Sequence, residues 1–185
     1  GNTDQSDTSI SLSATRRTVL SRFTFSADSI YGTLNGTENV NNHTVKSNYD
    51  VFVTPRFFLT PLGAEFFRDR IQNIDARISP YSGLGYALVH ESDWEWDARA
   101  ALGYRYTRFD SVPVGESDVD ETATGNLGTN LSADLTSDIE LTLSYFIAIG
   151  LEDIDNTNHD ASLLLTFDFL WDLDFDVGVT WKRVG

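Results

Sequence analysis

The chain has no cysteine, only three histidines and few basic residues. Without cysteine it can form no disulfide, thiolate zinc site or iron–sulfur cluster and has no thiol nucleophile, so metal chemistry would need carboxylates and histidines. Its 13 Lys and Arg residues against 28 Asp and Glu residues give a formal net charge of −15. Because such a chain repels the phosphate backbone, we expect no nucleic-acid partner.

Long hydrophobic runs are also missing. No segment of the sequence approaches about 18 consecutive apolar residues, which excludes a helical membrane span. The hydrophobic content of 41% and the aromatic content of 12% are nevertheless too high for a disordered chain. From the length of 185 residues we expect one domain, a single β-barrel over residues 1–185.

What the chain does have is strict alternation of apolar and polar residues. Over residues 94–106 the even positions are apolar or aromatic and the odd positions are charged or small, which predicts a strand with one apolar face. The same alternation is clear over residues 139–149, 161–171 and 173–181. It is weaker over residues 9–16, 22–31, 40–52, 57–68, 77–90 and 122–135. The sequence therefore predicts an all-β chain of about ten antiparallel strands, with a bulge or distorted pairing at Pro61 and Pro80.

Connections between the predicted strands alternate in length. Short turns are expected at residues 17–21, 53–56, 91–93, 136–138 and around 172. Longer polar loops are expected at residues 33–39, 69–76, 110–121 and 152–159. Short turns on one rim and long loops on the other are typical of an outer-membrane barrel, whose two termini normally lie in the periplasm. Because the first and last predicted strands both have their free ends on the long-loop rim, we expect one missing strand at each end and about twelve in the complete protein.

The alternation alone does not decide where the apolar face points. In a soluble lipocalin-like β-barrel it would line a cavity for a small apolar ligand, whereas in a transmembrane β-barrel it faces lipid. Strands of about 9–11 residues and aromatic residues near their ends favour lipid, because such strands cross a bilayer and aromatic side chains form girdles at its surfaces. The predicted girdle residues are Phe57, Phe58, Trp94, Trp96, Tyr104, Tyr106, Trp171 and Trp181.

Charges of both signs lie on the opposite, polar face and suit a hydrated lumen. The predicted lumen charge network comprises Glu65, Asp69, Arg77, Asp97, Arg99 and Arg105. It could form an ion-selective constriction or a salt-bridged network that fills a narrow barrel. The acidic stretches 116–121 and 152–160 offer oxygen ligands for Ca²⁺ or Mg²⁺ but lack the spacing of an EF-hand, so we expect solvated loops and no metal or cofactor. The alternative is that these loops bind divalent cations that bridge to lipopolysaccharide.

A hydrolase would need a nucleophile, a base and an orienting acid within reach of one another. His159, Asp160 and Ser162 can be assembled into such a surface trio only on paper, because no nucleophile motif accompanies them. We therefore expect no catalytic residues and no enzymatic activity.

Several short motifs resemble a known bacterial family. They are Gly1-Asn2-Thr3-Asp4, the stretch 49–59, Glu65 followed by Asp69, Gln72, Asp75 and Arg77, Gly83-Leu84-Gly85-Tyr86, and Gly103-Tyr104-Arg105-Tyr106. In these the chain resembles the YdiY-like family of salt-induced outer-membrane proteins, a domain of unknown function, over nearly its whole length.

The resemblance implies a location in the outer membrane of a Gram-negative bacterium and brings no activity. We accordingly expect a monomer that contacts outer-membrane lipid and lipopolysaccharide and meets the barrel-assembly machinery during biogenesis. Its role would be that of a narrow, porin-like channel or of an envelope-stability protein linked to salt or osmotic stress.

Overall fold

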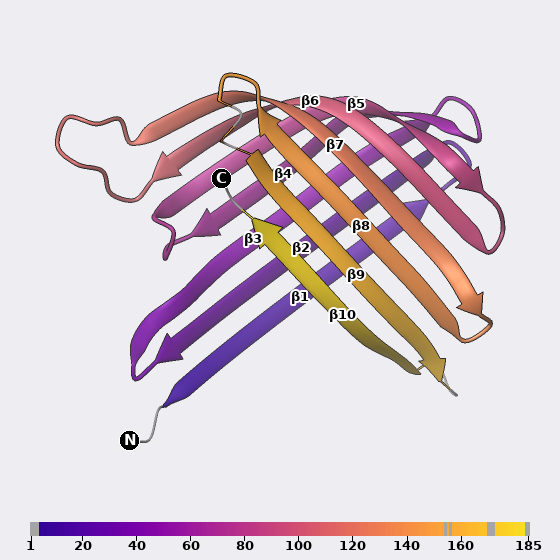
Figure 1. Cartoon of the computed structure of the whole chain (residues 1–185), viewed down its shortest axis with the longest axis horizontal. Helices are drawn as coiled ribbons and strands as arrows, with labels where there is room; N and C mark the ends of the chain where they lie inside the picture. Colours follow the sequence, from indigo (N-terminus) through magenta and orange to yellow (C-terminus); the bar gives the residue numbers. More distant parts are fainter. Residues whose placement is uncertain (1–3, 154, 156, 170–172, 184–185) are drawn as a thin grey trace. The chain divides into compact units, whose positions relative to one another are not determined.

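The structure is a computed structural model that describes residues 4–153, 155, 157–169 and 173–183. These residues form ten β-strands and no helix (Figure 1). The strands are β1 (Gln5–Arg17), β2 (Ser21–Leu34), β3 (Thr37–Phe52), β4 (Phe57–Asp69), β5 (Ile74–His90), β6 (Trp94–Phe109), β7 (Val119–Thr136), β8 (Ile139–Gly150), β9 (Thr157–Phe169) and β10 (Leu173–Arg183). All ten predicted strands are present, and no helix in the described chain is long and apolar enough to cross a membrane.

The strands form one sheet in chain order from β1 to β10 (Figure 1). The hairpins with a described register are antiparallel, for example β1 with β2, where Gln5 pairs with Leu34 and Arg17 with Arg22. The predicted all-β antiparallel class is therefore confirmed. Such a meander needs only local connections, because each strand pairs with the strand that follows it in the sequence.

One predicted loop is wrong. Residues 33–39 were expected to form a long polar loop, but β2 ends at Leu34 and β3 begins at Thr37. Asn35 and Gly36 have φ angles of 51° and 75°, and positive φ at both central residues defines the tight hairpin turn that favours Asn-Gly. The pairing of β2 with β3 therefore continues through residues 33–34 and 37–39, whose mostly polar composition by itself is typical of a loop. The connection expected over 69–76 likewise shortens, to residues 70–73 between β4 and β5.

Proline 61 lies within β4, which remains one strand, and the alternation of its side chains changes there. Before it Phe58 and Thr60 are buried, Pro61 and Leu62 are then both exposed, and Phe67 and Asp69 are buried beyond them. A β-bulge inserts one additional residue and so reverses the alternation, and this pattern therefore fits the bulge predicted at Pro61 from its missing N–H. β5 also continues through Pro80.

The described chain divides into two compact units. The first comprises Gly1–Val51, Thr60–Ser82 and Gly103–Thr122, and the second comprises Phe52–Leu59, Gly83–Leu102 and Ala123–Gly185. The first unit thus holds β1, β2 and most of β3 with the two connections β4–β5 and β6–β7. The second holds β8, β9 and β10 with the turns β3–β4 and β5–β6.

Burial in the described residues is the reverse of that in a soluble domain. Only three hydrophobic residues are buried, Phe58, Phe67 and Ile74. Eleven buried residues are polar or charged: Thr44, Asn48, Asp50, Thr60, Asp69, Arg77, Arg105, Thr107, Thr122, Thr124 and Asn126. Large hydrophobic side chains are exposed on every strand, from Ile10 on β1 to Val179 on β10. Polar side chains therefore occupy the buried face and apolar ones the surface, whereas soluble proteins bury their apolar residues.

Candidate functional site

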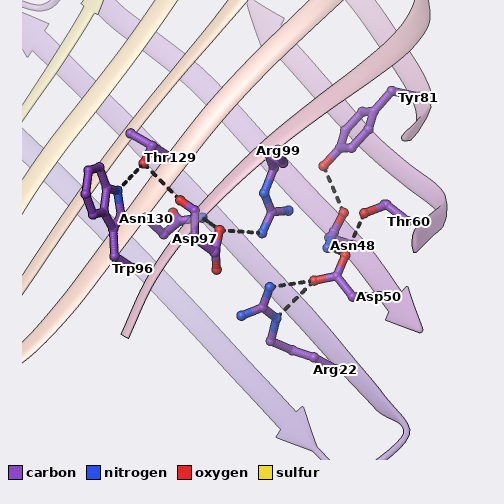
Figure 2. Close-up of polar contacts among 10 residues, drawn as sticks. All are labelled: Arg22, Asn48, Asp50, Thr60, Tyr81, Trp96, Asp97, Arg99, Thr129 and Asn130. Carbon is purple, nitrogen blue, oxygen red and sulfur yellow. Dashed lines mark hydrogen bonds and ion pairs between the residues drawn. The ribbon is translucent and has the colours of Figure 1, made fainter. Parts of the chain in front are cut away.

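Asp50 is the centre of a buried polar cluster in the first unit. Its carboxylate has no exposed surface and accepts hydrogen bonds from Arg22 Nε at 2.9 Å, Asn48 Nδ2 at 2.7 Å and Thr60 Oγ1 at 2.7 Å. Tyr81 Oη in turn donates to Asn48 Oδ1 at 3.2 Å. Figure 2 shows Arg22, Asn48 and Thr60 converging on Asp50. A buried carboxylate with this many donors is a fixed, fully paired charge.

The pairing of β2 with β3 brings Arg22, Asn48 and Asp50 of this cluster together. Arg22 lies directly opposite Asp50 in the β2–β3 register, and Asn48 lies two residues before Asp50 on the same face of β3. The sequence-based network contained neither Arg22 nor Asp50. Both were missed because their pairing depends on the register of the β2–β3 hairpin, which the incorrect loop had hidden.

Four of the six residues predicted to form the lumen charge network lie in the first unit, and two of these are buried arginines. Arg105 is 2% exposed and Arg77 is 8% exposed. Arg77 Nε donates to Thr107 Oγ1 at 3.2 Å, and its guanidinium lies 5.6 Å from the centre of the Phe67 ring. The hydroxyl and the aromatic ring replace part of the hydration that burial removes from this cation.

Glu65 and Asp120 supply negative charge to the two arginines. Both carboxylates attract Arg77 and Arg105, whereas the two guanidinium groups repel one another. Glu65 is also 3.6 Å from Lys46 Nζ. This part of the polar face therefore carries charges of both signs in mutual contact or at short range.

Asp69, the fourth predicted network residue in the first unit, shapes a turn. Its Oδ1 accepts hydrogen bonds from the backbone N–H groups of Ile71 at 2.9 Å and Gln72 at 3.1 Å, and its Oδ2 accepts one from Asn42 Nδ2 at 3.1 Å. Such bonds to the amides two and three residues further along the chain stabilise a turn, which here joins β4 to β5. Asp69 thus satisfies two backbone N–H groups of the short β4–β5 connection.

Asp97 and Arg99 form the corresponding pair in the second unit. Arg99 Nη2 is 3.5 Å from Asp97 Oδ1, which also accepts a hydrogen bond from Asn130 Nδ2 at 3.2 Å (Figure 2). The Arg99 guanidinium lies 5.5 Å from the centre of the Phe58 ring. Gly85 makes room for that ring, because a Cβ there would be 2.1 Å from Phe58 Cζ.

Most predicted girdle residues that the structure describes are at the surface. Trp94, Trp96, Tyr104 and Trp181 are exposed, Phe57 and Tyr106 are half-buried, Phe58 is 1% exposed, and Trp171 lies outside the described residues. Consecutive residues of a strand point to opposite faces, so Phe57 and Phe58 cannot both face outward, and Phe58 is the inward one. Trp96 Nε1 donates to Thr129 Oγ1 at 2.8 Å, which fixes this indole (Figure 2).

The hypothetical hydrolase trio is not arranged as a catalytic site. Its members are His159, Asp160 and Ser162. His159 Nδ1 shares a hydrogen bond of 2.8 Å with Tyr145 Oη, and Ser162 Oγ is 2.7 Å from Ser144 Oγ. As neighbours on β9, His159 and Asp160 point to opposite faces. Within the described part of the chain, no three His, Asp or Glu side chains are grouped to hold a metal ion.

Comparisons with known proteins place the fold. A family model described as "Protein of unknown function, DUF481" matches residues 1–184. Among solved structures the chain is similar to the NanC porin, determined in a rhombohedral crystal form, with a TM-score of 0.58 and 13% sequence identity. The alignment covers 95% of this chain and 83% of that one, and at this identity the likeness shows the fold alone. No curated protein matches the sequence.

Proposed function

The chain belongs to the DUF481 family of proteins of unknown function, and from its fold and the distribution of its side chains we propose that it is an outer-membrane β-barrel of a Gram-negative bacterium. Its exposed apolar side chains would face lipid, and its buried polar face would line or fill the interior.

The observation that carries this proposal is the inverted burial. Among the residues that the structure describes, eleven polar or charged ones are buried against three hydrophobic ones, while large apolar side chains are exposed on all ten strands. Water would penalise such a surface, whereas the hydrocarbon core of a bilayer accepts it. A soluble barrel that binds an apolar ligand would need the opposite arrangement, with its apolar face inward.

For the role we propose a narrow channel lined by charges of both signs, without enzymatic activity. The likeness to a porin fold, the attraction of buried Arg105 to Asp120 and Glu65, and the Asp97–Arg99 ion pair support it. A second role, a non-conducting protein that supports the envelope under salt or osmotic stress, is favoured by Asp50. This carboxylate is wholly buried and accepts hydrogen bonds from three side chains, so its role is structural and it is not available to bind a passing ion.

The experiment that tests the membrane assignment is gel mobility of the full chain, unboiled and boiled, recovered from an outer-membrane fraction. A closed β-barrel resists the detergent of the gel until heated, so we expect a band that shifts on boiling. The control is the same chain unfolded in urea before loading, which should run as the boiled form. Protein that stays in the buffer-soluble fraction, shows no shift and has blue-shifted tryptophan emission without detergent would contradict the proposal.

A further inference from the structure

We infer that three arginines at one end of β4 and β6 form an outward-facing site for the phosphate groups of a membrane lipid. The residues are Arg68, Arg70 and Arg108, called here the arginine patch. This inference rests on the proposed function, because it takes the exposed apolar face to be covered by lipid.

The arginine patch is exposed and lies beside the connections of the first unit. The side chains of Arg68, Arg70 and Arg108 are 43%, 51% and 52% exposed. Arg68 is the next-to-last residue of β4, Arg70 follows the strand, and Arg108 is the next-to-last residue of β6. The three guanidinium groups thus occupy strand ends, where a membrane-spanning strand meets the headgroups.

The same face of these strands is apolar one or two steps closer to the strand centres. Phe66 lies two residues before Arg68 and is exposed, and Tyr104 lies four residues before Arg108 and is exposed. Residues spaced by two or four share a face of a strand, so Arg68 and Arg108 each continue an apolar row, and Arg70 lies just beyond the row of β4. A lipid acyl chain against that row would carry its headgroup to the arginine patch.

Nearby carboxylates leave donors of the patch available. Asp75 accepts hydrogen bonds from both Arg108 Nε, at 2.8 Å, and Arg108 Nη2, and it is also 3.9 Å from Arg68 Nη2. Arg70 Nη1 is 4.0 Å from Glu38 Oε2, and Asp118 interacts with Arg108 only at longer range. A guanidinium has five N–H donors, and two of the three groups contact their carboxylates at the distance limit of an ion pair.

Phosphate is the chemistry that fits. Guanidinium groups bind phosphate through paired hydrogen bonds, and phosphorylated lipid headgroups attract basic residues at a membrane surface. The chain as a whole carries a net charge of −15, so a free anion in solution is repelled. A lipid phosphate is held beside the patch by its acyl chains, and this tethering favours the lipid over free phosphate.

The test compares two lipids that differ only in phosphate. The full chain, folded in detergent, is titrated with diphosphoryl lipid A and with lipid A of the same acyl chains but without phosphate, and bound lipid is measured by native mass spectrometry. We expect the phosphorylated lipid to bind at least about tenfold more tightly, since each basic residue near a lipid surface contributes several-fold. The variant R68Q/R70Q/R108Q should lose that preference.

A matched variant, R16Q/R17Q/R56Q, removes the same charge from exposed residues beside the short turns and should keep the preference. Inorganic phosphate at the same concentration should not compete. Equal binding of the two lipids, an equal loss in both variants, or competition by inorganic phosphate would each overturn the inference. A protein with no heat-modifiable band refutes the proposed function itself, whereas a heat-modifiable barrel without phosphate preference refutes only the arginine patch.

Discussion

Asp50 is the residue whose loss should affect stability most. Replacing it with alanine leaves the guanidinium of Arg22 largely buried without its carboxylate and removes the acceptor of Asn48 and Thr60. We expect Asp50→Ala to lower the free energy of unfolding by about 3–5 kcal/mol, the usual cost of breaking a buried ion pair from one side. Urea titration of the detergent-folded chain, followed by tryptophan fluorescence, measures this change.

The control for Asp50 is Glu116→Ala, which removes a carboxylate from an exposed loop position. It should change stability by no more than about 0.5 kcal/mol. Equal effects of the two substitutions would show that the polar cluster contributes nothing specific. Asp50→Asn should fall between them, because the amide keeps the shape and one acceptor but not the charge.

Among the elements of the first unit, the β4–β5 and β6–β7 connections are joined by the side chain of Asn73. Asn73 Nδ2 donates to the Ser111 backbone oxygen at 2.6 Å, and Asn73 Oδ1 accepts from Ser111 N and Oγ, both at 3.0 Å. Asn73 has a φ of 61°, which glycine also adopts without strain. We therefore expect Asn73→Gly to keep the turn but free the β6–β7 connection, so that residues 110–118 exchange their amide hydrogens several-fold faster.

Hydrogen exchange by mass spectrometry reports this change for the connection alone. The matched control is Asn35→Gly, which removes a side chain from a residue of similar backbone φ, 51°, in the β2–β3 turn, where Asn35 Oδ1 accepts from Asp4 N at 3.1 Å. That variant should leave exchange over 110–118 unchanged. An unchanged rate in Asn73→Gly would mean that the backbone bond from Asp110 N to Asn73 O suffices.

The strands could be predicted from the sequence because alternation of apolar and polar residues shows where a strand lies. Alternation identifies a strand and its two faces, so all ten strands were found and the even positions of β6, such as Trp94 and Leu102, were grouped on one face, which the structure exposes. It does not record register. The Asn35-Gly36 turn would have set the β2–β3 register to within one residue, but the bulge between Gly32 and Thr33 decides that Arg22 faces Asp50.

Ion passage is the property that belongs to the whole molecule. If the protein conducts, the full chain in a planar bilayer should give discrete current steps with a preference for cations, because acidic residues outnumber basic ones. Arg105→Gln removes a buried positive charge and should raise that preference further. Single-channel recording in asymmetric salt measures the reversal potential that reports it.

Wild-type protein that is heat-modifiable but gives a flat trace would exclude the channel and leave the envelope role. In that case Arg105→Gln should only lower stability. Glu116→Gln serves as the control, since it changes the charge by one unit, with the opposite sign, at an exposed loop position and should leave selectivity unaltered.

The inverted burial also has a consequence for how the two faces tolerate substitution. In the membrane setting that we propose, lipid chains are fluid and adapt to any apolar outline, so exposed positions such as Leu84, Leu102 and Val177 should exchange freely among apolar residue types. Inward positions are different, because Asp50 and its donors fit one another in charge, length and direction. Substitutions accumulated during evolution should therefore be concentrated on the exposed apolar face. Buried polar residues should change only when the side chains bonded to them change as well.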